Sequence, residues 1–370
     1  MTTTGQQLFT TLTADGKLTL ELSEESFPEP TGNQVLVKME AAPINPSDLA
    51  ILTSAADFDN AEYSLGKVVA QMPEPFLSGQ KSRHGQRLPA GNEGAGTVVA
   101  TGDSDMAKAL MGQRVACVPG NAFSQYAIAD AMMCLPLGDH SSEVGASSFV
   151  NPMTALGFVE NAKMDGQKAI VHTAAASNLG QMLIKICQED GIELVNIVRK
   201  AEHVEMLRGI GAKYVVNSSD DDFMEQLRTA IDESDAFYGF DPIGGGQAVD
   251  NVFKAMEQVA VSKMTEYSRY GSNQAKRMFI YGRLDFGPTI LTPSYGFGWT
   301  LSGWLLTPFL ANAGMETVVK MRTRVQQNLT TTFASSYKAK VNLEEMLTKE
   351  AISDYRQMKT GEKYLVTPWG

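Results

Sequence analysis

Between residues 152 and 281 the sequence alternates between short apolar runs and longer amphipathic segments, and this alternation constrains the fold more than any other feature. The expected strands are Ala169–His172, Leu194–Val198, Tyr214–Val216, Ala236–Phe240 and Met278–Tyr281. The expected helices are Pro152–Ala162, Asn178–Glu189, Glu202–Ile210, Asp221–Ile231 and Gln247–Met256. Strands that alternate with helices in this way indicate an α/β fold with a doubly wound parallel sheet.

The residues before this region favour β structure. Apolar and polar side chains alternate in Lys17–Leu22 and in Gln34–Glu40, and short strands are expected in Gly91–Thr101, Gln113–Val118 and Ser124–Ala129. Short strands with frequent turn signals are typical of a barrel-like β domain.

The alternation stops near Leu291, and the chain is then expected to return to the first domain. Met315–Gln327 and Leu343–Gln357 have helical patterns, and Tyr364–Val366 reads as a last strand. We therefore predict a discontinuous, mostly-β domain of residues 1–151 and 294–370 around an α/β domain of residues 152–293. Two long segments, 53–89 and 262–276, read as insertions of the kind that often form lids or binding loops.

Composition excludes several classes of protein. The formal net charge of −11 disfavours binding to the phosphate backbone of nucleic acids. The three cysteines are widely spaced, which argues against a disulfide framework and a zinc knuckle. The polar N-terminus lacks a signal-peptide pattern, and the apolar stretch Trp299–Leu310 is too short to cross a membrane. A cytoplasmic protein without membrane or nucleic-acid partners is expected.

The turn after the strand Ala169–His172 is the candidate cofactor site. Against the dinucleotide-binding pattern G-x-G-x-x-G, the key positions are Ala175, Ser177 and Gly180, of which only the last is glycine. Small residues there let the backbone approach a pyrophosphate, and the following helix supplies N–H donors. We predict cofactor contacts at Ser177, Asn178, Leu179 and Gly180, while a ligand-free turn of small residues would show the same pattern.

Two cations at the end of the next strand favour NADPH over NADH. Arg199 and Lys200 stand where an NAD site carries an acidic residue for the ribose 2′-hydroxyl, about 20 residues after the turn. Guanidinium and ammonium groups can instead pair with the 2′-phosphate of NADPH. The alternative is an exposed charged pair at a strand end.

The sequence resembles the zinc-free medium-chain dehydrogenases/reductases, in the branch of the quinone oxidoreductases and trans-2-enoyl-CoA reductases. The segments that carry the resemblance are Asn45–Asp48, Gly91–Gly96, Asn151–Ala155, Ser177–Gly180, Asn196–Arg199, Tyr281–Gly282 and Trp299–Trp304. It implies a Rossmann domain inserted into a GroES-like substrate domain, and a homodimer. It also implies NADPH contacts at Asn151, Thr154, Ser177–Gly180, Arg199, Lys200, Tyr281, Gly282, Leu284, Trp299, Ser302 and Lys363. For the segment from Trp299 to Ser302, the residues alone would indicate core packing.

No metal site is expected. Zinc-dependent relatives place a cysteine, a histidine and a further cysteine or acid in three segments where this chain has Asn45, Asn92 and Asn151. A neutral amide is a poor zinc ligand beside thiolate or imidazole.

Without a metal, hydride must go to an acceptor that is already activated, such as a C=C bond conjugated to a carbonyl, or a quinone. Enolate charge on the carbonyl oxygen then needs hydrogen-bond donors. In the enoyl reductases a tyrosine shortly after the N-P-S-D motif has this role, and Tyr63 is the nearest candidate, although a tyrosine in a surface loop is the alternative. Asn45 is a candidate for orienting nicotinamide or a carbonyl, or is a turn residue before Pro46.

We therefore predict a zinc-independent oxidoreductase that transfers hydride from NADPH to an enoyl thioester or enone. A quinone reductase on the same scaffold and a non-catalytic NADPH-binding protein are the alternatives.

Overall fold

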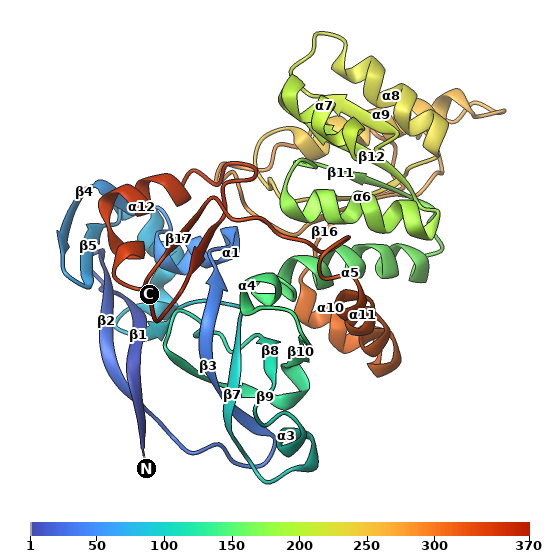
Figure 1. The fold of residues 1–370 in the computed structure, drawn as a ribbon. Coiled ribbons are helices and arrows are strands. Elements are labelled where there is room, and N and C mark those ends of the chain that lie inside the picture. The colour runs from blue at the N-terminus through green and yellow to red at the C-terminus, as the bar shows by residue number, and fades with distance from the viewer. Residues whose placement is uncertain (1) are drawn as a thin grey trace. The chain divides into compact units, whose positions relative to one another are not determined.

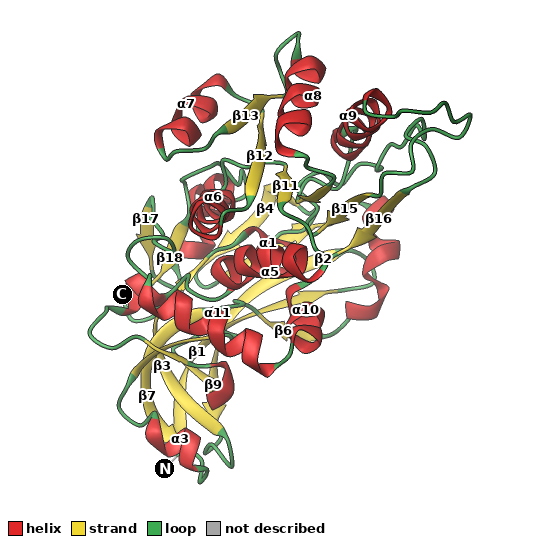
Figure 2. Cartoon of the chain, turned by 90° about the vertical axis from the view of Figure 1, so that its right-hand side faces the viewer, coloured by secondary structure: helices red, strands yellow, loops and turns green. Residues whose placement is uncertain are grey.

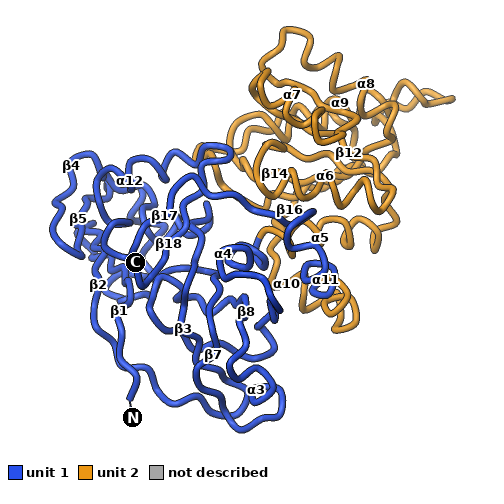
Figure 3. The backbone as a smooth tube through the Cα atoms, viewed as in Figure 1, with its two compact units in different colours: residues 1–150, 322–370 blue, residues 151–321 orange. Residues whose placement is uncertain are grey.

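The computed structural model describes residues 2–370, and the chain divides into two compact units (Figure 3). Unit 1 comprises residues 1–150 and 322–370, and unit 2 comprises residues 151–321. The second boundary lies inside a helix, well after the expected position at residue 293. The reason is that residues 299–303 form a strand of the unit 2 sheet, although polar side chains interrupt their apolar pattern.

Unit 2 is built on a six-stranded parallel sheet in the order β13-β12-β11-β14-β15-β16. Figure 1 labels β11, β12 and β16 among these strands. The strands of this sheet are β11 (Ala169–His172), β12 (Glu193–Val198), β13 (Tyr214–Asn217), β14 (Tyr238–Asp241), β15 (Lys276–Ile280) and β16 (Trp299–Gly303). Numbered from β11, this is the order 3-2-1-4-5-6 of dinucleotide-binding folds. Every residue of β11, β13 and β14 is buried, which explains their continuous apolar runs. The predicted doubly wound fold is confirmed.

Helices cover both faces of this sheet (Figure 2). They are α5 (Val150–Met164), α6 (Asn178–Asp190), α7 (Ala201–Gly209), α8 (Phe223–Ser234) and α9 (Ala248–Ser262). Helices α8 and α9 share an apolar cluster with Val171, Val195 and Val216. On the opposite face, the ring of Phe158 in α5 stacks on Phe240, with 3.9 Å between ring centroids. Two further helices, α10 (Leu306–Ala313) and α11 (Met315–Gln327), follow β16.

Unit 1 contains two mostly antiparallel sheets, as predicted for its mostly-β half. The five-stranded sheet has the order β4-β5-β2-β1-β6, with β1 (Thr3–Leu12), β2 (Lys17–Phe27), β4 (Asp57–Ser64), β5 (Lys67–Gln71) and β6 (Arg87–Pro89). The seven-stranded sheet has the order β10-β8-β7-β3-β18-β17, with β9 also paired to β3. Its strands are β3 (Gln34–Pro43), β7 (Gly94–Thr101), β8 (Arg114–Cys117), β9 (Tyr126–Asp130), β10 (Leu135–Pro136), β17 (Ala339–Val341) and β18 (Tyr364–Val366).

Short helices connect these strands. They are α1 (Pro46–Leu52), α2 (Glu74–Leu77), η1 (Ser78–Arg83), α3 (Asp105–Ala109), η2 (Ala131–Met133), α4 (Ser142–Gly145), η3 (Glu345–Leu347) and α12 (Lys349–Tyr355). The single helix expected over 343–357 is therefore two shorter helices, interrupted at Thr348, which is the N-cap of α12.

The segment 53–89 is largely an extension of the five-stranded sheet. Its strands β4 and β5 form a hairpin on the edge of β2, and β6 pairs with β1. The C-terminal residues complete the other sheet, because β18 pairs antiparallel with β3 and places Leu365 opposite Pro43. This pairing brings residues near both ends of the chain to one place. Among residues 2–370, no helix is long and apolar enough to cross a membrane.

Candidate active site and cofactor-binding turn

The turn between β11 and α6 has the close backbone packing expected of a pyrophosphate site. Ser177 is the N-cap of α6, and its Oγ accepts a hydrogen bond from the N–H of Gly180 at 3.2 Å. A Cβ on Gly180 would lie 2.1 Å from the carbonyl oxygen of Ala175, so only glycine fits. Glycine is therefore required for steric reasons at the third glycine position of the dinucleotide-binding pattern. At the other two glycine positions the chain has Ala175 and Ser177.

Arg199 and Lys200 directly follow β12, the neighbour of β11 in the sheet. Both are exposed, and the Lys200 ammonium lies 3.1 Å from Glu202 Oε1. Within residues 2–370 the Arg199 guanidinium makes no ion pair, while its carbonyl accepts a hydrogen bond from Ser219 Oγ at 2.8 Å. Because parallel strands end at one edge, Arg199 lies at the same sheet edge as the turn.

A second loop lies at this edge, Pro242–Gly246 after β14, and the sequence analysis did not predict it as part of the site. Asp241 is fully buried; its carboxylate accepts hydrogen bonds from Thr173 Oγ1 and from the N–H of Gly244. A Cβ on Gly282 would lie 2.8 Å from the Pro242 carbonyl oxygen, so the loops after β14 and β15 touch through their backbones. Three consecutive glycines after a buried aspartate were the signal that could have indicated this loop.

Some predicted cofactor residues direct their side chains into the interior of unit 2. The Tyr281 hydroxyl lies 2.8 Å from His172 Nε2, and burial lowers the pKa of His172 to about 3. Trp299 packs against Phe253 and Tyr295, with centroids 5.6 and 5.4 Å apart, which is the core packing that its residue type indicates.

The other predicted cofactor residues of unit 2 differ in exposure. Thr154 is buried in α5, Asn151 and Ser302 are partly buried, and Leu284 is exposed after β15. A cofactor contact through the side chain is therefore most accessible at Leu284.

Unit 1 holds a buried polar cluster around Asn45, which is only 1% exposed. The Asn45 side-chain Nδ2 donates to Glu93 Oε1 at 2.8 Å, and Lys363 Nζ donates to Asn45 Oδ1 at 2.9 Å. The other Glu93 oxygen accepts from the N–H groups of Phe149 and Val150 at 3.0 and 2.8 Å. Asn45 and Lys363 were predicted to be site residues separately; the structure brings them into contact.

Asp48 fixes the backbone of the same cluster. Its carboxylate accepts from the N–H of Asn45 and from the N–H of Asn92, both at 2.8 Å, and closes a capping box at the start of α1. Burial raises the pKa of Asp48 to about 7 and also raises the pKa of Glu93. Burial lowers the pKa of Lys363, against the opposing effect of these carboxylates.

Ser147 and Tyr337 extend the cluster. Lys363 Nζ donates to Ser147 Oγ at 3.3 Å, and the Tyr337 hydroxyl lies 3.0 Å from the same oxygen. Sequence reasoning missed both residues, since neither lies in a motif. Only the pairing of β18 with β3 places Lys363 beside Asn45.

Tyr63, the other predicted catalytic residue, lies on β4. Its partly buried hydroxyl donates to the carbonyl oxygen of Phe58 at 2.8 Å, and burial raises its pKa. In the described part of the chain it shares no hydrogen bond with Asn45, and its contact to Phe58 lies within β4, across the irregular part of that strand.

The described residues contain no group of three or more His, Cys, Asp or Glu side chains placed to hold a metal ion. The cysteines Cys117, Cys134 and Cys187 are buried, and none of them forms a disulfide bond.

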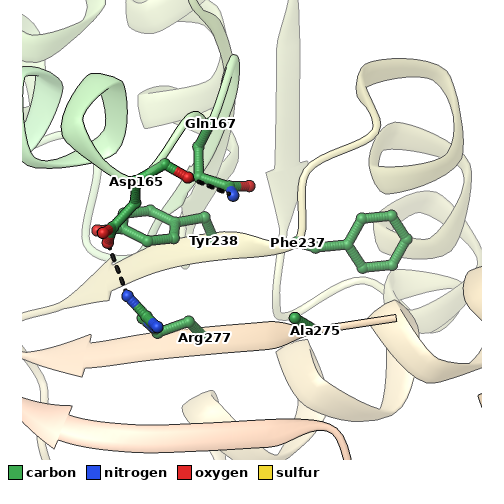
Figure 4. Close-up of a pocket in the computed structure, with 6 residues that line it drawn as sticks. All are labelled: Asp165, Gln167, Phe237, Tyr238, Ala275 and Arg277. Carbon is green, nitrogen blue, oxygen red and sulfur yellow. Dashed lines mark hydrogen bonds and ion pairs between the residues drawn. The ribbon is translucent and has the colours of Figure 1, made fainter. Parts of the chain in front are cut away.

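A small cavity of about 100 Å³ lies at the opposite edge of the unit 2 sheet, where β14 and β15 begin (Figure 4). Asp165 Oδ2 there accepts from the Tyr238 hydroxyl and from Arg277, both at 2.7 Å. Because the charge of Arg277 is balanced within the network, we interpret these contacts as structural.

Fold and site together define a class of protein: a mostly-β unit with a buried polar cluster, in one chain with a dinucleotide-binding type of α/β unit. Comparison with known proteins shows which proteins the chain resembles. The alcohol dehydrogenase GroES-like domain matches residues 31–146. The mitochondrial enoyl-[acyl-carrier-protein] reductase of Xenopus tropicalis is 30% identical over 224 residues, which are 56% of this chain and 53% of that protein. The Arabidopsis thaliana enzyme of the same name is 26% identical over 74% of this chain and 66% of its own length.

A solved structure covers nearly the whole chain. It is a putative NADPH:quinone reductase from Mesorhizobium loti, with 28% identity, a TM-score of 0.73, and coverage of 99% of this chain and 98% of that one. The curated relatives above are matched over only about half to two thirds of their length. Over almost its whole length the chain is similar to proteins of the quinone oxidoreductase and enoyl reductase branch of the medium-chain dehydrogenases/reductases.

Proposed function

We propose that this protein is an oxidoreductase that uses NADPH to reduce a C=C bond conjugated to a carbonyl, in an enoyl thioester or an enone. The observation that carries the proposal is the buried Asn45 amide, which Glu93 and Lys363 hold in place. Such an amide can donate a hydrogen bond to a carbonyl oxygen on which charge develops. The relatives named as enoyl reductases support this substrate class.

The cofactor would bind along the carboxyl edge of the unit 2 sheet. The backbone of Ser177–Gly180 would hold the pyrophosphate, and Arg199 with Lys200 would hold the 2′-phosphate. The loops after β14 and β15, including Gly282 and Leu284, form the same edge. When bound, NADPH supplies the hydride.

Within unit 1, Asn45 would orient and polarise the substrate carbonyl. Its electrostatic contribution depends on burial, because a fixed donor is most effective where water is excluded. Tyr63 stays a prediction as a catalytic hydrogen-bond donor, and its hydroxyl would first have to leave the carbonyl of Phe58.

A quinone reductase is the second candidate. The structure that matches almost the entire chain carries that name, and a quinone oxygen could accept the same Asn45 hydrogen bond.

We also propose a homodimer formed through β16. This strand is the edge of the unit 2 sheet, whereas β15 lies between β14 and β16. The interface is therefore expected at this outermost strand. An unpaired edge can pair with the same edge of a second copy about a two-fold axis.

The experiment is NADPH oxidation by the purified protein with two panels of acceptors, one of enoyl thioesters and enones and one of quinones. Turnover of the first panel supports the proposal, and turnover of quinones alone supports the second candidate. If the protein binds NADPH but reduces neither panel, the activity proposal is wrong.

The cofactor assignment is tested with Arg199→Ala. Loss of a charged hydrogen-bonding partner is expected to raise the Kd for NADPH about 10- to 100-fold and to leave the Kd for NADH unchanged. Arg208→Ala, which removes a cation from the end of α7, is the control. Equal weakening of both cofactors by Arg199→Ala would contradict the 2′-phosphate assignment.

A further inference from the structure

We propose that Lys363 is a positioning residue, which fixes the orientation of the Asn45 amide and thereby presents one of its N–H groups to the substrate. The inference rests on the proposed function and names which group of the substrate Asn45 recognises. It also replaces the cofactor contact that the family resemblance implied for Lys363.

The two contacts of the Asn45 side chain allow only one orientation. Oδ1 accepts from the Lys363 ammonium, and Nδ2 donates to the Glu93 carboxylate. A flipped amide would place Oδ1 against the carboxylate and Nδ2 against the ammonium, so that both contacts would become repulsive. Because Asn45 is 1% exposed, water cannot compensate for either loss.

This orientation leaves one donor of Asn45 unused. An amide nitrogen carries two N–H groups, and one of them is directed to Glu93. Within residues 2–370 the second has no partner. Oδ1 already accepts from the Lys363 ammonium, so the unused N–H is the group of Asn45 whose hydrogen-bonding capacity is wholly available to a ligand. The ligand group complementary to this N–H is an acceptor, such as the carbonyl oxygen of an enoyl thioester or enone.

Lys363 is itself held from two sides. Besides Asn45 Oδ1, its ammonium donates to Ser147 Oγ, which also lies beside the Tyr337 hydroxyl. Two of its three N–H groups are thus committed inside unit 1. A direct contact with a cofactor phosphate would require these bonds to break, and would release the Asn45 amide.

The first test compares Lys363→Met with Lys363→Arg in steady-state kinetics. Lys363→Met is expected to lower kcat for a short enoyl thioester about 10- to 100-fold, as expected for loss of an oriented donor, while the Kd for NADPH stays within twofold. Lys363→Arg keeps a cation beside Oδ1 and is expected to restore part of the loss. Lys340→Met, at the exposed position of β17, is the matched control.

The opposite pattern would overturn the proposal. If Lys363→Met raises the Kd for NADPH tenfold or more and leaves kcat unchanged, Lys363 contacts the cofactor. Equal kcat losses in Lys363→Arg and Lys363→Met, with unchanged melting temperatures, would also contradict a role for the cation in orienting the amide.

A second measurement does not depend on turnover. The side-chain ¹H–¹⁵N signals of Asn45, assigned by their absence in Asn45→Asp, are expected to be slow to exchange with solvent. In Lys363→Met they should shift and lose protection, and in Lys340→Met they should not change. Signals that are unaffected by Lys363→Met would overturn the positioning role. If they respond but the wild-type protein reduces neither panel, the proposed function fails and the positioning role stands.

Discussion

Asp48 has a carboxyl group that is 1% exposed and bonded to two backbone N–H groups, yet burial dominates and raises its pKa from 3.8 to about 7. The folded state therefore holds a proton on Asp48 that the unfolded state releases above pH 4. The stabilisation of the folded state by this bound proton is fully present below pH 3.8 and is lost as the pH rises to about 7.

We predict that the stability of the wild-type protein falls relative to that of Asp48→Asn as the pH rises from 4 to 8. A pKa raised by about three units corresponds to a change of up to about 4 kcal/mol in the difference in unfolding free energy. Urea unfolding at each pH measures it, with the exposed Asp59→Asn as control. A difference that stays constant with pH would mean that Asp48 does not titrate in this range.

At this scale the sequence predicted residues within motifs better than it predicted their contacts. Asn45 and Gly180 were identified from local patterns, because a turn or a helix start depends on neighbouring residues. The contact of Lys363 with Asn45 joins residues 318 positions apart, and Ser147 and Tyr337 join the cluster only after folding. No local pattern carries that information.

The elements of unit 2 were the most predictable part of the chain, because buried parallel strands and amphipathic helices have distinct periods. The segment 53–89 was harder to interpret. Its outermost strand β4 is mostly polar and lies at the sheet edge, and β5 is only five residues long, so neither has the extended apolar pattern that identifies buried strands.

Substitution of Gly180 tests how far the turn before α6 depends on close backbone packing. Because a Cβ would overlap the Ala175 carbonyl, Gly180→Ala is expected to destabilise the protein by about 1–3 kcal/mol and to weaken NADPH binding. Gly209→Ala is the control, since nothing lies within 4 Å of its Cβ position, and alanine favours a helix. Urea unfolding and NADPH titration measure both effects. Equal stabilities of the two variants would show that the turn moves without cost.

The loop between α9 and β15 is held by a buried ion pair. Lys276 Nζ is fully buried and lies 2.7 Å from Glu257 Oε2, and Glu257 also accepts from the N–H and hydroxyl of Ser272. This ion pair holds the C-terminal end of segment 262–276 in place. The loop-like sequence of the segment does not indicate such a contact.

We predict that Glu257→Ala destabilises the protein by about 3–5 kcal/mol, because it leaves the Lys276 ammonium buried without its carboxylate. The double variant Glu257→Leu with Lys276→Met removes both charges and is expected to be more stable than Glu257→Ala. Thermal unfolding of the three proteins measures this. If the double variant is the least stable, the ion pair contributes net stability beyond avoiding an unpaired charge.

For the whole molecule, the discontinuous arrangement was visible in the sequence, but its second boundary was not. The strand β16 reads as a mixed segment, since Thr300 and Ser302 interrupt its apolar residues. Its membership of the sheet depends on pairing with β15, which places Lys276 opposite Trp299. The edge of the sheet, and with it the proposed dimer contact, therefore became evident only from the structure.

This edge allows a test of the homodimer that leaves the sheet itself intact. The N–H of Trp304 donates to the carbonyl oxygen of Ile280, and the carbonyl oxygen of Gly298 accepts from the N–H of Lys276. The even-numbered residues along this strand therefore form the hydrogen bonds to β15. In a parallel pair, the backbone groups of the intervening residues point away from that neighbour. The N–H of Leu301 therefore points outward.

Leu301→Pro is expected to yield a monomer in light scattering after gel filtration, while Leu301→Ala stays dimeric, because only proline removes the outer donor. A dimer that survives Leu301→Pro with unchanged affinity would place the interface elsewhere.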